Sequence, residues 1–96
     1  MSVNMGDPAL FSRTVTLQLE QGLHIRVCSV VVSLVVPFDG PVTIRNGDKS
    51  ADASSMFDLL QLAAEPGAEL TIESQGDGAE AVLDKLEALF SGEIEY

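Results

Sequence analysis

Residues 25–36, with the sequence Ile-Arg-Val-Cys-Ser-Val-Val-Val-Ser-Leu-Val-Val, decide the fold of this 96-residue chain. Six valines give the segment a high β propensity, and composition alone favours a buried strand. Two observations favour a helix instead, because a dozen residues is long for a strand and Pro37 then closes the segment. Apolar residues also recur at helical spacing: Cys28, Val31 or Val32, and Val35. Periodicity therefore favours a helix, with a buried strand as the alternative.

Alternation between apolar and polar residues predicts strands on both sides of this segment. Residues 13–19 place Val15, Leu17 and Leu19 on one face, and residues 68–74 do the same with Leu70 and Ile72. Such a period of two is typical of a half-buried strand. Between these strands, Asn46-Gly47 is a strong hairpin signal. It predicts two more strands, at residues 41–45 and 49–52.

Two further helices are predicted in the second half of the chain. Residues 56–64 follow Ser54-Ser55 and carry apolar residues at helical spacing, before Glu65-Pro66-Gly67 ends the pattern. Asp77 and Glu80 fit a capping box. The helix that follows has one apolar stripe: Ala79, Val82, Leu83, Leu86 and Phe90.

With residues 25–36 as a helix, the predicted order is β-α-β-β-α-β-α. Elements in this order form a domain of class α+β. We expect an open-faced β-sandwich, in which three helices cover one face of a four-stranded antiparallel sheet and the other face meets water.

Composition and charge exclude several classes of function. The chain has 46% hydrophobic residues, one cysteine, and a formal charge of −10 from 5 basic and 15 acidic residues. This charge disfavours nucleic acid and anionic membranes as partners, because both attract clustered Lys and Arg. No apolar run reaches the ~20 residues of a membrane span, and the N-terminus lacks the pattern of a signal peptide. We therefore expect a cytoplasmic protein with no cofactor. A lone cysteine and a lone histidine also argue against a metal site.

The single histidine, His24, stands where a strand gives way to the predicted helix, in Gly22-Leu23-His24-Ile25-Arg26. A helix that begins at Ile25 would direct its first amides, those of Ile25, Arg26 and Val27, toward His24. These amides and the helix dipole favour an anion such as phosphate. Arg26 could add a charge-assisted contact, and an imidazole nitrogen is nucleophilic near neutral pH. The alternative is a polar cap or an ordinary surface histidine.

Gly22-Leu23-His24-Ile25-Arg26 resembles the phosphorylation-site motif Gly-Leu-His-x-Arg-Pro-Ala of the HPr family, the phosphocarriers of the phosphoenolpyruvate:sugar phosphotransferase system. The resemblance continues through Asn46-Gly47, the serine motif at residues 53–57, and the last strand and helix. It covers residues 12–91. It leaves residues 1–11 as a flexible leader and residues 92–96 as a short acidic tail. The family's fold has the element order predicted above, with residues 25–36 as a helix.

This resemblance implies a phosphocarrier and not an autonomous enzyme. His24 would accept a phosphoryl group on Nδ1 from a phosphoenolpyruvate-dependent protein kinase, enzyme I. It would donate the group to a sugar-specific carrier or to a regulatory protein. Arg26 would help to hold the phosphoryl group. Met56, Phe57 and Leu60 would contribute an apolar surface for partners.

The chain departs from the family pattern at several positions. Val27 replaces a proline and restores an amide donor, so we expect altered transfer rates with the chemistry retained. Cys28 is either a small buried residue or a thiol whose pKa the helix dipole lowers. Ser55 aligns with the serine that HPr kinase/phosphorylase modifies in some bacteria, and it also fits a helix cap. Asp58 adds negative charge where the family often has glycine or lysine, which indicates different partners.

Two other functional classes stay open. The first is a regulatory interaction module on the HPr fold, which transfers no phosphate and is controlled at Ser55 or not at all. The second is an unrelated α+β binding domain in which His24 lies at a turn by chance. Phosphorylation of His24 by enzyme I separates the carrier from both alternatives.

Overall fold

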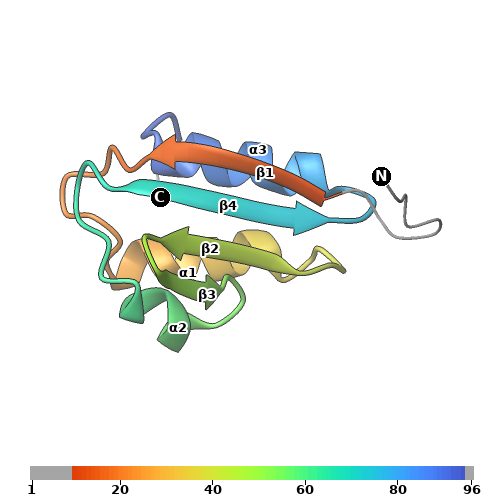
Figure 1. The fold of residues 1–96 in the computed structure, drawn as a ribbon, viewed down its shortest axis with the longest axis horizontal. Helices are drawn as coiled ribbons and strands as arrows, with labels where there is room; N and C mark the ends of the chain where they lie inside the picture. The colour runs from red at the N-terminus through yellow and green to blue at the C-terminus, as the bar shows by residue number, and fades with distance from the viewer. Residues whose placement is uncertain (1–9, 95–96) are drawn as a thin grey trace.

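The computed structural model describes residues 10–94, which form four strands and three helices (Figure 1). A single sheet has the strand order β1-β4-β2-β3, and every neighbouring pair is antiparallel. The helices lie on one face of this sheet (Figure 1). The predicted α+β open-faced sandwich is therefore confirmed. The elements are β1 (Leu10–Thr16), α1 (Ile25–Val35), β2 (Val42–Asn46), β3 (Lys49–Asp52), α2 (Met56–Gln61), β4 (Glu69–Gln75) and α3 (Ala79–Phe90).

The segment that decides the fold is the helix α1. Its buried residues recur every three or four positions: Val27, Cys28, Val31 and Val35. A helix turns such a stripe toward one neighbour, and here the stripe faces the core. The β propensity of its valines is overridden by this burial, so the helix prediction is confirmed and the strand alternative is wrong.

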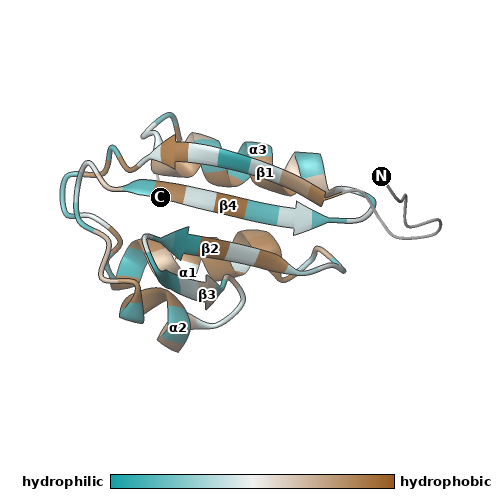
Figure 2. Cartoon of the chain, viewed as in Figure 1, coloured by the Kyte–Doolittle hydropathy of each residue, from teal (hydrophilic) through white to brown (hydrophobic). Residues whose placement is uncertain are grey.

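Strand β4 lies at the centre of the sheet. It pairs with β1 through Thr14↔Thr71 and with β2 through Ile44↔Ile72. Leu70 and Ile72 point into the core, as the alternation in the sequence predicts. Polar residues occupy the alternate positions of the strands, and Figure 2 shows this alternation on β4.

The hairpin between β2 and β3 turns at the predicted place, with one residue of difference. Asn46 is the last residue of β2 and pairs with Lys49, so the loop consists of Gly47 and Asp48. Gly47 has φ +64°, which glycine adopts at little cost. The Asn46 side chain donates to the Leu62 carbonyl at 3.0 Å and ties the hairpin to the end of α2.

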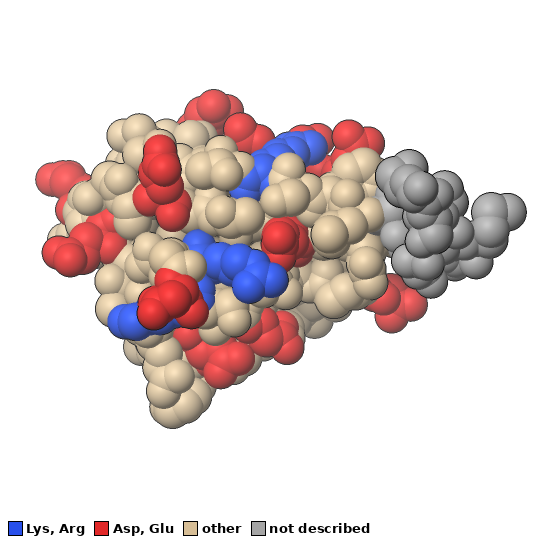
Figure 3. Space-filling view, viewed as in Figure 1, with Lys and Arg blue, Asp and Glu red and all other residues tan. Residues whose placement is uncertain are grey.

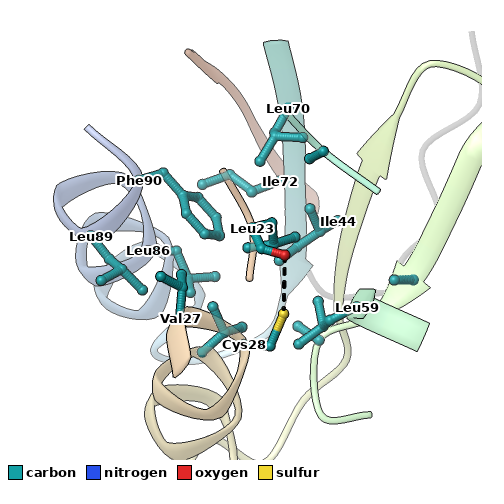
Figure 4. Packing of buried hydrophobic residues seen from close by; sticks show 14 of the residues in the cluster. Leu23, Val27, Cys28, Ile44, Leu59, Leu70, Ile72, Leu86, Leu89 and Phe90 are labelled. Carbon is teal, nitrogen blue, oxygen red and sulfur yellow. Dashed lines mark hydrogen bonds between the residues drawn. The ribbon is translucent and has the colours of Figure 1, made fainter. Parts of the chain in front are cut away.

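Aliphatic side chains from both layers fill the core (Figure 4). Leu17, Ile44 and Leu70 from the sheet side meet Val27 of α1 and Phe90 of α3, and all five are fully buried. Every residue of the predicted stripe on α3 is buried, and Leu89 joins it. The buried Ser74 hydroxyl donates to the Pro41 carbonyl at 2.8 Å.

Three boundaries differ from the sequence prediction by three residues, and the others differ by one residue at most. Strand β1 begins at Leu10, so Leu10 and Phe11 belong to the sheet and not to the expected leader. Its regular pairing ends at Thr16, although Leu17 and Leu19 continue the buried face. Helix α2 ends at Gln61, three residues before the predicted end. The rest of the expected leader, residues 1–9, and residues 95–96 of the expected tail lie outside the described residues.

The predicted capping box at Asp77 and Glu80 is wrong. The N-cap of α3 is Gly78, in a left-handed conformation with φ +87°, and no side chain caps the helix. The Ala79 amide instead donates to the Gly76 carbonyl at 3.1 Å. The turn through two glycines with positive φ therefore starts the helix, and Glu80 acts only as an acidic residue in its first turn. Within residues 10–94, no helix is long and apolar enough to cross a membrane.

Candidate functional site

His24 is the residue that precedes the first turn of α1. Its backbone is extended, with φ −93° and ψ 176°, and its carbonyl accepts the first hydrogen bond of the helix from the Cys28 amide at 2.9 Å. The His24 amide donates to the Gly22 carbonyl at 3.1 Å. The side chain is half-buried at this junction. The imidazole is thus held at the N-terminal end of α1, where the sequence predicted it.

Three amides of α1 precede its first intrahelical hydrogen bond, those of Ile25, Arg26 and Val27. Such amides carry the positive end of the helix dipole. The first turn holds no acidic residue that would neutralise them. Ile25 and Arg26 are exposed, whereas the Val27 side chain is fully buried. The residues predicted to bind phosphate therefore lie together beside His24.

The turn before His24 packs closely against the loop that follows α2. Gly22 has φ +72°, and a Cβ atom at this position would lie 2.5 Å from the Ala64 carbonyl oxygen. The Leu23 amide donates to the same oxygen at 3.0 Å. Only glycine allows the two backbones to approach so closely. Gly22 and Ala64 therefore fix where the chain enters α1.

The loop after α2 contains a feature that the sequence analysis missed. Ala63 has φ +49° and is the one non-glycine residue with a positive φ among residues 10–94. This conformation is costly for an L-residue. It turns the chain so that the next residue, Ala64, can present its carbonyl to Leu23. No residue type in Leu62-Ala63-Ala64 marks this turn, and the predicted helix ran through it.

The Cys28 thiol is buried one turn after His24. Its Sγ atom lies 3.8 Å from the Leu23 carbonyl oxygen, to which it can donate a weak hydrogen bond (Figure 4). Removal from water raises the pKa of this thiol. The prediction of a small buried residue is confirmed, and the alternative of a thiol with a lowered pKa is wrong.

Comparison with known proteins agrees with this geometry. The family model described as "PTS HPr component phosphorylation site" matches residues 11–92. The chain belongs to the HPr family. It is 35% identical to the phosphocarrier protein NPr of Shewanella violacea, over 86% of this chain and 91% of that protein. It is 37% identical to the phosphocarrier protein HPr of Streptomyces coelicolor, over 86% of this chain and 90% of that protein.

Solved structures of the HPr family share the fold. The crystal structure of a phosphocarrier protein HPr from Bacillus anthracis superimposes with a TM-score of 0.81 at 28% identity. The match covers 85% of this chain and 98% of the Bacillus chain. This HPr-family chain is a phosphocarrier of the phosphotransferase system, an intermediate that carries a phosphoryl group and is not itself an enzyme.

Ser55 caps helix α2 of this HPr-family chain. Its hydroxyl accepts from the Asp58 amide at 3.2 Å, as the cap prediction requires. Two carboxylates bond to residues of the turn that leads into this cap. The Asp58 carboxylate accepts from the Asp52 amide at 3.4 Å. The Asp52 carboxylate accepts from the Ser54 amide and hydroxyl at 2.9 and 2.7 Å, which lowers the pKa of Asp52.

Helix α2 exposes part of the apolar surface predicted for partners. Phe57 and Leu60 are exposed, whereas Met56 is half-buried and packs against the core. Helix α1 packs against α2, and Ile25 at its start is also exposed. Among residues 10–94, no three His, Cys, Asp or Glu side chains gather as a metal site would require.

Proposed function

We propose that His24 accepts a phosphoryl group on Nδ1 from a phosphoenolpyruvate-dependent kinase of the enzyme I type and donates it to an acceptor protein. One observation carries the proposal: His24 lies at the start of α1, beside three amides that precede the first hydrogen bond of the helix. A phosphoryl group on Nδ1 would occupy the place of a capping side chain. In that place the amides of the first turn donate to an acceptor.

For phosphoryl transfer, this chain has to position the His24 imidazole and to provide hydrogen-bond donors for the phosphoryl oxygens. The imidazole nitrogen attacks the phosphorus, and the bond from phosphorus to its donor breaks as the N–P bond forms. The three non-bridging oxygens then need hydrogen-bond donors. The amides of Ile25, Arg26 and Val27 supply them from the backbone, and the exposed Arg26 guanidinium supplies a charge-assisted donor. The same contacts are released when an acceptor takes the group.

The acceptor of the phosphoryl group is a sugar-specific carrier or a regulatory protein. A carrier that is charged by one protein and discharged by another presents the same histidine to both. The exposed apolar residues Phe57 and Leu60 lie on the helix that packs beside α1, so both partners can contact them while reaching His24. A carrier supplied from phosphoenolpyruvate acts in the cytoplasm.

Incubation with phosphoenolpyruvate and purified enzyme I tests this proposal. We expect one phosphate per chain, labile in acid and stable in base, and mapped to His24 by mass spectrometry. His24→Gln should abolish the label, and Ser55→Ala should leave it unchanged. An unlabelled wild-type chain, or a label that survives His24→Gln, would show that His24 is not the acceptor.

The second candidate is a regulatory interaction module controlled by HPr kinase/phosphorylase at Ser55. The position of its hydroxyl at the start of α2 favours this candidate, because a phosphate is stabilised at a helix N-terminus. The carboxylates of Asp52 and Asp58, which bond to residues of the same turn, oppose a phosphate there by repulsion. Capping is therefore the role that we assign to Ser55 in the unmodified chain. Treatment with ATP and the kinase, followed by a search for acid-stable phosphate, tests the modification.

A further inference from the structure

The surface around His24 combines exposed apolar side chains with unbalanced negative charge. Ile25 is 65% exposed, Phe57 70% and Leu60 41%, although all three are large hydrophobic residues. They lie on α1 and α2, which pack against each other, and the Leu23–Ala64 hydrogen bond joins the start of α1 to the loop after α2. We name these three residues the His24 patch. Grouped apolar exposure of this kind marks a protein interface.

Few cations border the His24 patch. The segments that build it, residues 17–35 and 53–67, contain one basic residue, Arg26, and three acidic residues: Glu20, Asp58 and Glu65. The Gly22 turn lies against Glu65, whose Cα would be 3.2 Å from a Cβ at Gly22. In Figure 3, acidic side chains gather at the left edge, where the loops before α1 and after α2 lie in Figure 1.

The four remaining cations leave the negative charge around the His24 patch in place, and one of them, Lys85, lies on α3. Arg13 of β1 forms ion pairs with Asp84 and Glu87 of α3, and Arg45 pairs with Glu73 at 3.0 Å. Lys49 lines a shallow hollow together with Leu60, but Asp48 precedes it in the hairpin loop. The neighbourhood of the His24 patch therefore stays negative, and a phosphoryl group on His24 would add to this charge.

We infer that the His24 patch docks onto a partner protein that receives Phe57 in an apolar hollow and surrounds that hollow with Lys and Arg side chains. This inference rests on the proposed function and names the chemistry of its partner. We call Glu20, Asp58 and Glu65 the acidic rim of this patch. A partner surface with Lys and Arg around its apolar hollow is attracted by such a rim, and an acidic partner surface is repelled. Arg26 stays available to the phosphoryl group, because the partner and not the carrier supplies the other positive charges.

Neutralising the acidic rim tests the sign of the partner's charge. We would measure kcat/KM for phosphorylation by the enzyme I encoded in the same genome, with Glu20→Gln and Glu65→Gln. Each should lower kcat/KM about threefold at low salt, and the effect should fade as salt screens the charges. Glu80→Gln is the matched control, because Glu80 is exposed at the start of α3, at the opposite end of the molecule in Figure 1.

The apolar centre is tested separately. Phe57→Ser should lower kcat/KM about tenfold, mainly through KM, since a buried aromatic anchor contributes strongly to an interface. Val36→Ser is its control, because Val36 is 65% exposed at the far end of α1. Thermal unfolding of both variants should match the wild type, because neither side chain is in the core.

The outcomes separate this inference from the proposed function. If the wild type is phosphorylated on His24 and the rim variants react faster or at the same rate, the inference is overturned and the proposed function stands. An equal effect of Glu80→Gln would also overturn it, since the effect would then come from net charge. A wild type that takes no phosphate overturns both.

Discussion

The backbone amide of Cys28 donates to the carbonyl oxygen of His24 at 2.9 Å. This hydrogen bond is the first of helix α1. The amide of Val27 comes immediately before this bond and has no place in the helical ladder. In the family motif a proline occupies this position and has no N–H to donate. A phosphoryl group on His24 would therefore have one more backbone donor within reach than the motif provides.

Val27→Pro should weaken the phosphorylated state of His24. Proline is tolerated in the first turn of a helix, so the fold should persist. One lost hydrogen bond to a charged group should shift the phosphoryl equilibrium with phosphoenolpyruvate and enzyme I about tenfold toward the unphosphorylated chain. The measurement is the ratio of the two forms at equilibrium, together with the chemical shift of the Val27 amide proton in the wild type on phosphorylation.

Val27→Ala is the control for that experiment. It removes two methyl groups from a fully buried side chain but keeps the amide. Its equilibrium should stay close to that of the wild type, although its stability should fall by about 1–3 kcal/mol. If alanine and proline shift the equilibrium equally, the third amide does not contact the phosphoryl group.

Gly22→Ala should disturb the site through its backbone. Alanine would be strained at φ +72°, and its Cβ would collide with the Ala64 carbonyl oxygen at 2.5 Å. We expect a loss of about 3 kcal/mol in the free energy of unfolding, from the left-handed conformation and the clash together. Urea denaturation measures this loss, and phosphorylation of His24 should slow as the start of α1 shifts.

Gly67→Ala separates the two causes. Gly67 has φ +88°, but nothing lies within 4 Å of a Cβ placed there. The Gly67→Ala variant should therefore lose about 1–2 kcal/mol in the free energy of unfolding, from the left-handed conformation alone. Its phosphorylation should be unchanged. Equal losses at both positions would show that the contact with Ala64 has no energetic weight.

The sequence predicted the elements of the fold better than the contacts between them. Alternation located Val15, Leu70 and Ile72 on the buried side of the sheet, because burial on one face imposes a period of two. For residues 25–36, valine propensity and helical periodicity pointed in opposite directions. Packing against the sheet and the other helices decided between them. The helical spacing of the buried residues reflects this packing, whereas the β propensity of the valines does not.

For the candidate site too, local features could be predicted from the sequence and contacts between distant segments could not. The position of His24 and the three amides at the start of α1 could be predicted, because they depend on neighbours in the sequence. The contact of Gly22 with Ala64 could not, because it joins segments about forty residues apart. The left-handed turn at Ala63 was also missed, since alanine is typical of helices and nothing in its type indicates φ +49°.

Cys28 should be unreactive in the folded chain. Its side chain is fully buried and burial raises the pKa of the thiol, so little thiolate is present at neutral pH and reagents cannot reach it. Reaction with a disulfide reagent should be about a hundredfold slower than in urea, because it has to wait for local or global unfolding. Ser29→Cys in a Cys28→Ala background is the control. Ser29 is exposed on the same turn, and a thiol there should react at once.

Ser54→Ala should raise the pKa of Asp52 toward its ordinary value. In the wild type the Ser54 hydroxyl and amide both donate to the Asp52 carboxylate and lower its pKa, and the hydroxyl is the larger cause. A carboxyl group whose pKa is lower in the folded than in the unfolded chain stabilises the fold above its unfolded pKa. This contribution is lost as pH falls through the folded pKa.

The variant and the wild type should therefore differ in stability at neutral pH and converge in acid. Titration of the Asp52 carboxyl by NMR measures the pKa, and urea denaturation across the acidic range measures the convergence. Ser50→Ala is a suitable control, since Ser50 is exposed on the same hairpin and pairs through its backbone with Arg45. The difference in free energy of unfolding between Ser54→Ala and the wild type could also persist unchanged below the folded pKa of Asp52. In that case the Ser54 side chain would stabilise the local turn without acting through the Asp52 carboxylate.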